Sequence, residues 1–213
     1  MIDARQAILD FTVRARPTLV PELELHLVDS SGPWWHAQPE ETPFSDWPYW
    51  AVAWPGGQAL ARHLLDTPQL VAGKRVMDFG SGGAIEGVAA ARLGADVTCV
   101  DIDPLAGAAA QLNAELNGVA LRTSPQNMLG QLALDAEVVL VGDVVSSAEL
   151  GSAVWPWLRA LAKRGTCVLV GDAGRVAPPS GTQLERLAVF HAPFDGDIRG
   201  TTLWPCDVWR VRG

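Results

Sequence analysis

The sequence predicts an α/β fold in which a doubly wound, mostly parallel sheet is covered by helices on both faces. From about residue 57 onward, apolar runs of strand length alternate with segments whose apolar residues have helical spacing. The runs are Val-rich and nearly continuous, as in strands that are buried on both faces. The chain has 213 residues, 48% hydrophobic and 19% charged, which suits one domain with a sizeable core.

The central part of the chain supplies the alternating elements. The first is a helix that begins at Gly57, in GQALARHLLD, and ends before Pro68. The expected elements that follow are a strand at 75–79, a helix at 83–94, a strand at 96–101, a helix at 104–118, a short strand near Leu121, a strand at 136–143, a helix at 149–162 and a strand at 166–172. In such a sheet, a ligand binds at the carboxyl ends of the strands.

The two ends of the chain depart from this alternation. Residues 1–56 are rich in Pro and Trp, and we expect them to form an N-terminal cap or lid segment with one short strand in LVPELELHLVD. Residues 57–213 are expected to form the main domain. Their last part, 184–213, is expected to begin with a helix and to end with two strands that form an antiparallel edge.

Charge and composition exclude several classes of function. The 24 acidic and 16 basic residues give a net charge of −8, which disfavours binding to nucleic acid. No apolar run reaches the ~20 residues that span a bilayer, and the N-terminus lacks the pattern of a secretory signal, so we expect a cytoplasmic protein. The three Cys and four His residues have no metal-ligand spacing, and no metal site is expected. Small molecules and protein partners remain.

The segment DFGSGGAIEG has the composition of a loop that approaches a ligand closely. Gly80 and Gly82 allow the backbone to turn sharply after the strand. Asp101 ends the next strand, about 20 residues later, where a carboxylate can accept hydrogen bonds from both ribose hydroxyls. Sites for nicotinamide dinucleotides and for S-adenosylmethionine share this spacing.

Asp78 favours S-adenosylmethionine over a dinucleotide. A dinucleotide holds its pyrophosphate against backbone N–H groups at a helix N-terminus, and a carboxylate close by would repel that anion. S-adenosylmethionine has no phosphate and carries an ammonium and a sulfonium group, so Asp78 is expected to be among the residues that bind this cofactor. Upstream, Trp50 and Trp54 either cover the sulfonium with their ring faces or pack beneath the N-terminal cap.

Five segments of the chain together resemble a known family. They are YWAVAWPGGQALARHLLD, GKRVMDFGSG, DIDPLAGAAAQLNAELNG, VLVGDV and LVGDAGR. In this order they are similar to the seven-strand S-adenosylmethionine-dependent protein lysine methyltransferases, and most of all to the group that methylates the electron transfer flavoprotein β subunit. The resemblance implies a Rossmann-like seven-strand methyltransferase sheet, S-adenosylmethionine as cofactor, and the electron transfer flavoprotein β subunit as a protein substrate.

The resemblance also implies roles for single residues on the donor side of the site. Gly80 and Gly82 line the methionine part of the donor, and Asp101 binds its ribose. Asn127, in PQNML, lies near the adenine.

On the substrate side, the resemblance places Asp143 beside the transferred methyl group. Asp143 would orient the substrate amine and take its proton late; the alternative is a strand-end carboxylate that binds backbone amides. Asp172 and Arg175 frame the mouth of the site. Two residues depart from the family pattern: Ser146 replaces the Tyr of an acid-x-x-aromatic motif, and Ala84 replaces a third glycine.

These departures leave other functions open. The loss of the Tyr is compatible with a small-molecule methyltransferase, or with a protein that binds the donor without catalysis. A nicotinamide-dependent oxidoreductase is the remaining alternative.

Overall fold

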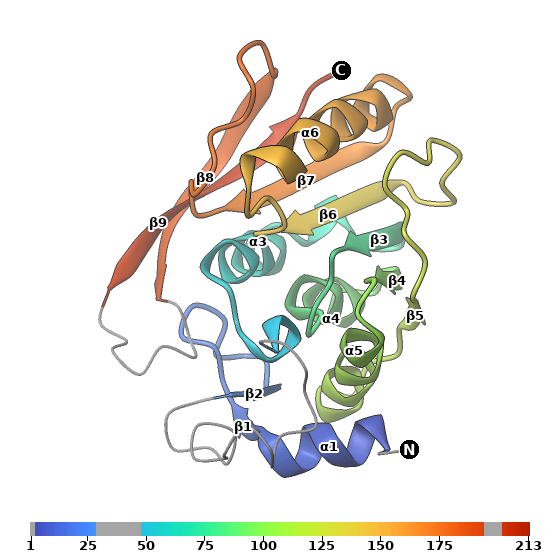
Figure 1. The fold of residues 1–213 in the computed structure, drawn as a ribbon, viewed down its shortest axis with the longest axis vertical. Helices are drawn as coiled ribbons and strands as arrows, with labels where there is room; N and C mark the ends of the chain where they lie inside the picture. Colours follow the sequence, from blue (N-terminus) through green and yellow to red (C-terminus); the bar gives the residue numbers. More distant parts are fainter. Residues whose placement is uncertain (1–2, 29–47, 194–201) are drawn as a thin grey trace.

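The computed structural model describes residues 3–28, 48–193 and 202–213, and its centre is a seven-stranded sheet (Figure 1). The strand order is β5-β4-β3-β6-β7-β9-β8. The strands are β3 (Arg75–Phe79), β4 (Asp96–Val100), β5 (Arg122–Ser124), β6 (Val138–Gly142), β7 (Cys167–Asp172), β8 (Leu184–Pro193) and β9 (Leu203–Val211). Strands β3 to β7 are parallel, and β9 runs antiparallel to both β7 and β8. The expected sheet with an antiparallel C-terminal edge is confirmed.

Four helices connect and cover these strands: α3 (Pro55–Asp66), α4 (Ile85–Arg92), α5 (Pro104–Leu116) and α6 (Ala148–Lys163). Side chains alternate along β6, so Leu140 packs with α3 and α4 in one core cluster, while Val139 and Val141 pack with α6 in another. Asp103 and Ser147 cap α5 and α6 with their side-chain oxygens. No helix within the described ranges is long and apolar enough to cross a membrane.

The described N-terminal residues pack beside the sheet. Helix α1 (Ala4–Phe11) lies against α5, and β1 (Val13–Ala15) pairs with β2 (Leu25–Leu27) in a separate antiparallel ribbon. A short 3₁₀ helix, η1 (Tyr49–Ala51), leads into α3, and η2 (Pro68–Leu70) follows α3. The strand expected in LVPELELHLVD is confirmed only as β2. Much of the expected cap lies outside the described residues, so the division of the chain into 1–56 and 57–213 stays a prediction.

The expected helix at the start of 184–213 is wrong. Residues from Leu184 to Pro193 form β8, which pairs with β9 along its whole length. The pairing is irregular between Arg186 and Ala188, which interrupts the alternation of apolar and polar side chains. Because of this irregularity, the apolar residues of β8 have a spacing that is typical of a helix.

Candidate functional site

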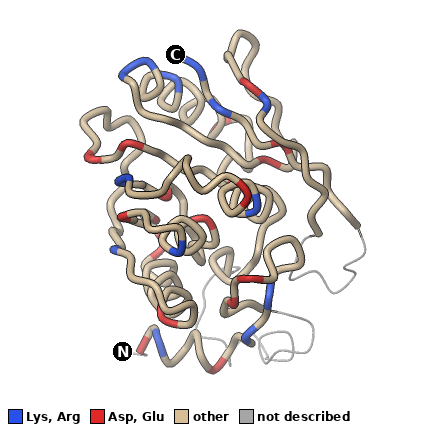
Figure 2. Tube along the Cα trace, turned by 180° about the vertical axis from the view of Figure 1, so that it is seen from behind, with Lys and Arg blue, Asp and Glu red and all other residues tan. Residues whose placement is uncertain are grey.

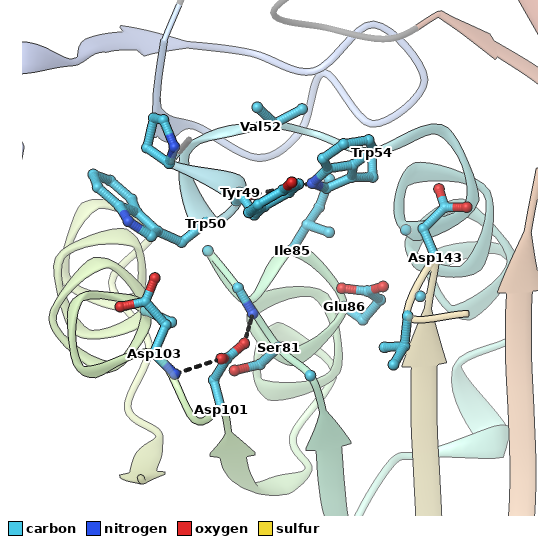
Figure 3. A pocket seen from close by; sticks show the side chains of 18 of the residues that line it. Tyr49, Trp50, Val52, Trp54, Ser81, Ile85, Glu86, Asp101, Asp103 and Asp143 are labelled. Atoms are coloured by element: carbon cyan, nitrogen blue, oxygen red, sulfur yellow. Dashed lines mark hydrogen bonds between the residues drawn. The ribbon is translucent and has the colours of Figure 1, made fainter. Parts of the chain in front are cut away.

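A cavity of about 850 Å³ lies at the carboxyl ends of β3, β4 and β6. Its floor is the loop after β3, and its roof is η1 together with Trp54 (Figure 3). Residues after β4 form one wall and residues after β6 form the opposite wall. The chain therefore builds the site where the doubly wound fold predicts it.

The glycine loop brings its backbone close to the cavity. Gly80 and Gly82 have φ values of +66° and +48°, a conformation that side chains other than glycine rarely adopt. A Cβ atom at Gly80 would lie 2.6 Å from Cγ2 of Val144. Both glycines line the cavity, as expected from the sequence. Ala84, in place of the family's third glycine, also has a positive φ, of +61°.

Asp101 ties the wall after β4 to the glycine loop. Its Oδ2 accepts a hydrogen bond from the Gly82 amide at 2.8 Å, and its Oδ1 accepts one from the Asp103 amide at 2.9 Å (Figure 3). Asp101 also lines the cavity, where its carboxylate can accept hydrogen bonds from a ligand. This position agrees with the ribose-binding role expected from the sequence.

Asp143 lies in the opposite wall, directly after β6. Its φ of +52° falls in the left-handed region, which Asp tolerates better than most residues. Its carboxylate accepts hydrogen bonds from the amides of Gly56 and Ala173, and it lies 2.8 Å from Nη2 of Arg175. Burial raises the pKa of Asp143, and the positive charge of Arg175 opposes this rise. Asp143 thus does bind backbone amides, and it also contributes a buried carboxylate to the cavity.

The roof of the cavity is aromatic. The Trp54 ring stacks on Tyr49, with centroids 5.9 Å apart, and the guanidinium carbon of Arg175 lies 4.9 Å from the Trp54 centroid. Trp50 reaches the cavity as well, but it is only 2% exposed and packs in a cluster with Ala106 and Ala109. Trp54 thus lies in the roof and Trp50 mainly packs, and the role of either ring toward a sulfonium stays a prediction.

Glu86 is a cavity residue that the sequence analysis missed. It belongs to the first turn of α4, lines the cavity and is only 4% exposed (Figure 3). Gly57 and Gly142 leave space for its carboxylate, since a Cβ at Gly142 would overlap Oε1 of Glu86. The signal in the sequence is a lone acid in the apolar stretch GAIEGVAAA.

Asp78 does not line the cavity. The side chain is 1% exposed and lies beneath the loop, where its Oδ2 accepts a hydrogen bond from the Gly87 amide at 2.9 Å. Burial raises the pKa of Asp78 to about 7. The expectation that Asp78 contacts the ligand directly is therefore not supported; this carboxylate holds the first turn of α4 against β3.

Of the remaining predicted residues, two line the cavity and two do not. Ser146 and Arg175 line the cavity. Asn127 does not: it is exposed, and its side chain accepts a hydrogen bond from the Leu129 amide. Asp172 is 8% exposed at the end of β7, where burial raises its pKa to about 6, and it also does not line the cavity. The structure thus assembles Asp143, Ser146 and Arg175 on one side of the cavity.

The ionisable residues that line the cavity are predominantly acidic. Its carboxylates belong to Glu86, Asp101, Asp103 and Asp143, and Arg175 is the one Lys or Arg among its described lining residues. Basic residues instead gather where α6 and β9 end, near the C-terminus (Figure 2). In the described part of the chain, no group of three His, Cys, Asp or Glu residues could hold a metal ion.

Comparisons with known proteins find similar sequences and similar folds. The family model "Ribosomal protein L11 methyltransferase (PrmA)" matches residues 59–148. The electron transfer flavoprotein β-subunit lysine methyltransferase of Xenopus laevis is 41% identical over 86% of this chain and 75% of its own length. The protein of the same name from Danio rerio is 38% identical over 98% of this chain and 83% of its own length.

Solved structures share the fold at low sequence identity. A tRNA (uracil-54, C5)-methyltransferase from Pyrococcus abyssi, in complex with S-adenosylhomocysteine, has a TM-score of 0.53 and 14% identity. The match covers 95% of this chain and 44% of that one.

Proposed function

Because the chain belongs to the family of electron transfer flavoprotein β-subunit lysine methyltransferases, we propose that it transfers methyl groups from S-adenosylmethionine to lysine side chains of a protein. The electron transfer flavoprotein β subunit is the proposed substrate. The observation that carries this proposal is one cavity with Asp101 in one wall and the buried Asp143, beneath Trp54, in the other.

The charge of the cavity suits S-adenosylmethionine better than a dinucleotide. Four carboxylates and a single Arg, already paired with Asp143, offer a pyrophosphate no free cation among the described lining residues. An ammonium or sulfonium group is favoured in the same surroundings. The side chains that line the cavity, and not the buried Asp78, thus favour S-adenosylmethionine.

The donor chain is proposed to lie along the glycine loop. Gly80 and Gly82 leave room for a close approach, and Asp101 would accept hydrogen bonds from the ribose hydroxyls. When bound, S-adenosylmethionine supplies a methyl group on a positively charged sulfur, which an amine can displace.

The protein's own part is to hold the amine and to remove its charge. Arg175 shows that Trp54 and Asp143 together accommodate a cationic side chain. A substrate lysine that displaces Arg175 would place its nitrogen against Oδ1 of Asp143. Burial beneath Trp54 lowers the pKa of that lysine, and the carboxylate orients the amine and accepts its proton. Alignment of this kind can lower a barrier by about 7–11 kcal/mol.

A labelling experiment tests the proposal. The protein is incubated with methyl-labelled S-adenosylmethionine and either purified electron transfer flavoprotein β subunit or a fractionated cell lysate. We expect label in lysine residues of the β subunit, reduced at least about 100-fold by Asp143→Asn. Label in the small-molecule fraction would instead identify a small-molecule methyltransferase. Binding of S-adenosylhomocysteine without any labelled product would identify a binding protein. The cytoplasmic location also stays a proposal, which cell fractionation tests.

A further inference from the structure

Glu86 is a buried carboxylate of the cavity that neither the ribose-binding side nor the amine-binding side explains. It extends from α4 into the space that Gly57 and Gly142 leave, and its carboxylate faces the cavity between the glycine loop and Asp143 (Figure 3). Among the residues that the structure describes, no Lys or Arg pairs with it.

The surroundings of Glu86 make its own negative charge costly. The charged side chains that act on its pKa are the carboxylates of Asp78 and Asp143. Burial raises the pKa of Glu86 well above its ordinary range, and both neighbours act in the same direction. A buried acid in such a place needs either a proton or a cation from a ligand.

The position of Glu86 in the sheet indicates which part of the donor would meet it. Strand β3 lies between β4 and β6, and the glycine loop follows β3. Asp101 lies on the β4 side of this loop, and Glu86 lies on the β6 side, against Gly142. A donor whose ribose binds Asp101 and which crosses the loop reaches Glu86 with its amino-acid end.

We propose that Glu86 binds the α-ammonium group of the methionine part of S-adenosylmethionine. This inference rests on the proposed function only in requiring that the cavity binds this donor. A charge-assisted hydrogen bond in a buried site is strong, and it would offset the cost of keeping Glu86 ionised. Glu86 and Asp101 then hold the two ends of the donor, on either side of the glycine loop.

Calorimetric titration with two adenosine ligands tests the proposal. S-adenosylhomocysteine carries the amino-acid end, and 5′-methylthioadenosine lacks it; both carry the ribose. In Glu86→Gln, which preserves shape and removes the charge, we expect the affinity for S-adenosylhomocysteine to fall 10- to 100-fold. The affinity for 5′-methylthioadenosine should change less than threefold. The matched control, Asp101→Asn, should weaken both ligands by a similar factor.

Other outcomes would overturn either the inference or the proposed function. If Glu86→Gln loses affinity equally for S-adenosylhomocysteine and 5′-methylthioadenosine, Glu86 has a structural role and the inference is overturned. A loss of affinity for S-adenosylmethionine but not for S-adenosylhomocysteine would place Glu86 against the sulfonium. This result would also overturn the inference. If the unmodified protein binds neither S-adenosylmethionine nor S-adenosylhomocysteine, the proposed function itself fails. Thermal denaturation of Glu86→Gln confirms that the variant is folded.

Discussion

Arg175 forms an ion pair with Asp143 at 2.8 Å, although the Asp143 side chain is only 1% exposed. The arginine lies over the Trp54 ring at the same time, so it occupies the place that we propose for the substrate amine. Its positive charge also lowers the pKa of Asp143, against the effect of burial. Arg175 therefore favours the ionised form of Asp143.

The first prediction concerns the pH dependence of methyl transfer in Arg175→Ala. Without the cation, the pKa of Asp143 rises further, so Asp143 becomes protonated at a higher pH. If ionised Asp143 is required, activity is lost as pH falls, and the variant loses it at a higher pH. We expect the acidic limb of the kcat/KM profile to move up by at least about one pH unit.

Arg186→Ala is the matched control for this prediction. Arg186 also pairs with an aspartate, Asp207, and also lies over a tryptophan, Trp209, but it does not line the cavity. Removal of the Arg186 side chain should leave the pH profile of kcat/KM unchanged. An equal shift in both variants would mean that the effect does not pass through Asp143.

Most of the fold could be predicted from the sequence because its central strands are short, buried and bounded by clear helix signals. The runs that became β3, β4, β6 and β7 were found within one or two residues of their ends. Strand β8 was not, because its apolar spacing does not distinguish a helix from a strand that pairs irregularly. Only the pairing of β8 with β9, the next strand along the chain, decides that conformation. Helix α1 lies within residues 1–56, for which the sequence predicts a cap with one short strand.

The site could be predicted where a residue directly follows β4 or β6, and not where tertiary packing places it. Asp101 and Asp143 follow strands whose ends meet at one edge of the sheet. Asp78 lies within β3, so its side chain faces α4 instead of the cavity. Glu86 reaches the cavity only because Gly57 and Gly142, from two other elements, make room for it.

The second prediction concerns Asp78 and the pH dependence of stability. Its pKa of about 7 in the folded protein lies above the ordinary value of 3.8. At pH values between these two pKa values, Asp78 is protonated in the folded state and ionised in the unfolded state. The contribution of Asp78 to stability is therefore fully present below about pH 4 and is lost as pH rises through about 7. The whole difference corresponds to about 4 kcal/mol.

Asp78→Asn should remove this dependence, because the amide oxygen can still accept the hydrogen bond from Gly87. Relative to the unmodified protein, the variant should gain free energy of unfolding between pH 5 and pH 8. Urea denaturation at both pH values measures the gain. Asp135→Asn, at a side chain that is 91% exposed, is the control and should follow the unmodified protein. If the free energy of unfolding changes with pH in the same way in Asp78→Asn and in the unmodified protein, burial does not shift the pKa of Asp78.

The third prediction concerns the contact between the glycine loop and the roof. A Cβ atom at Gly83 would collide with the carbonyl oxygen of Trp50, and the Gly83 carbonyl accepts a hydrogen bond from Asn113. Because a backbone oxygen has to move, Gly83→Ala should lower the free energy of unfolding by about 1–3 kcal/mol. It should also weaken binding of S-adenosylhomocysteine. Thermal denaturation and calorimetry measure the two effects.

Gly107→Ala is the comparison for Gly83→Ala. Gly107 lies in α5, where a Cβ atom would make ordinary contacts with Thr123 at 3.7 Å. Ala favours a helix over Gly by up to about 1 kcal/mol, so this variant should be as stable as the unmodified protein or more so. If Gly83→Ala is as stable as Gly107→Ala and binds S-adenosylhomocysteine equally well, the close contact between Gly83 and Trp50 does not constrain the loop.

The fourth prediction concerns Ser146, which lines the cavity three residues after Asp143. A Tyr at this position, as in the resembling family, would add an aromatic wall beside the proposed amine site. It would hold the lysine chain and exclude water from Asp143, which favours the uncharged amine. We expect Ser146→Tyr to raise kcat/KM for methyl transfer to a protein lysine at least about 10-fold, with donor affinity changed less than threefold. The control is Ser152→Tyr, on an exposed face of α6 that does not line the cavity. If Ser146→Tyr binds the donor normally and its transfer rate matches that of Ser152→Tyr, the missing aromatic side chain does not limit the reaction.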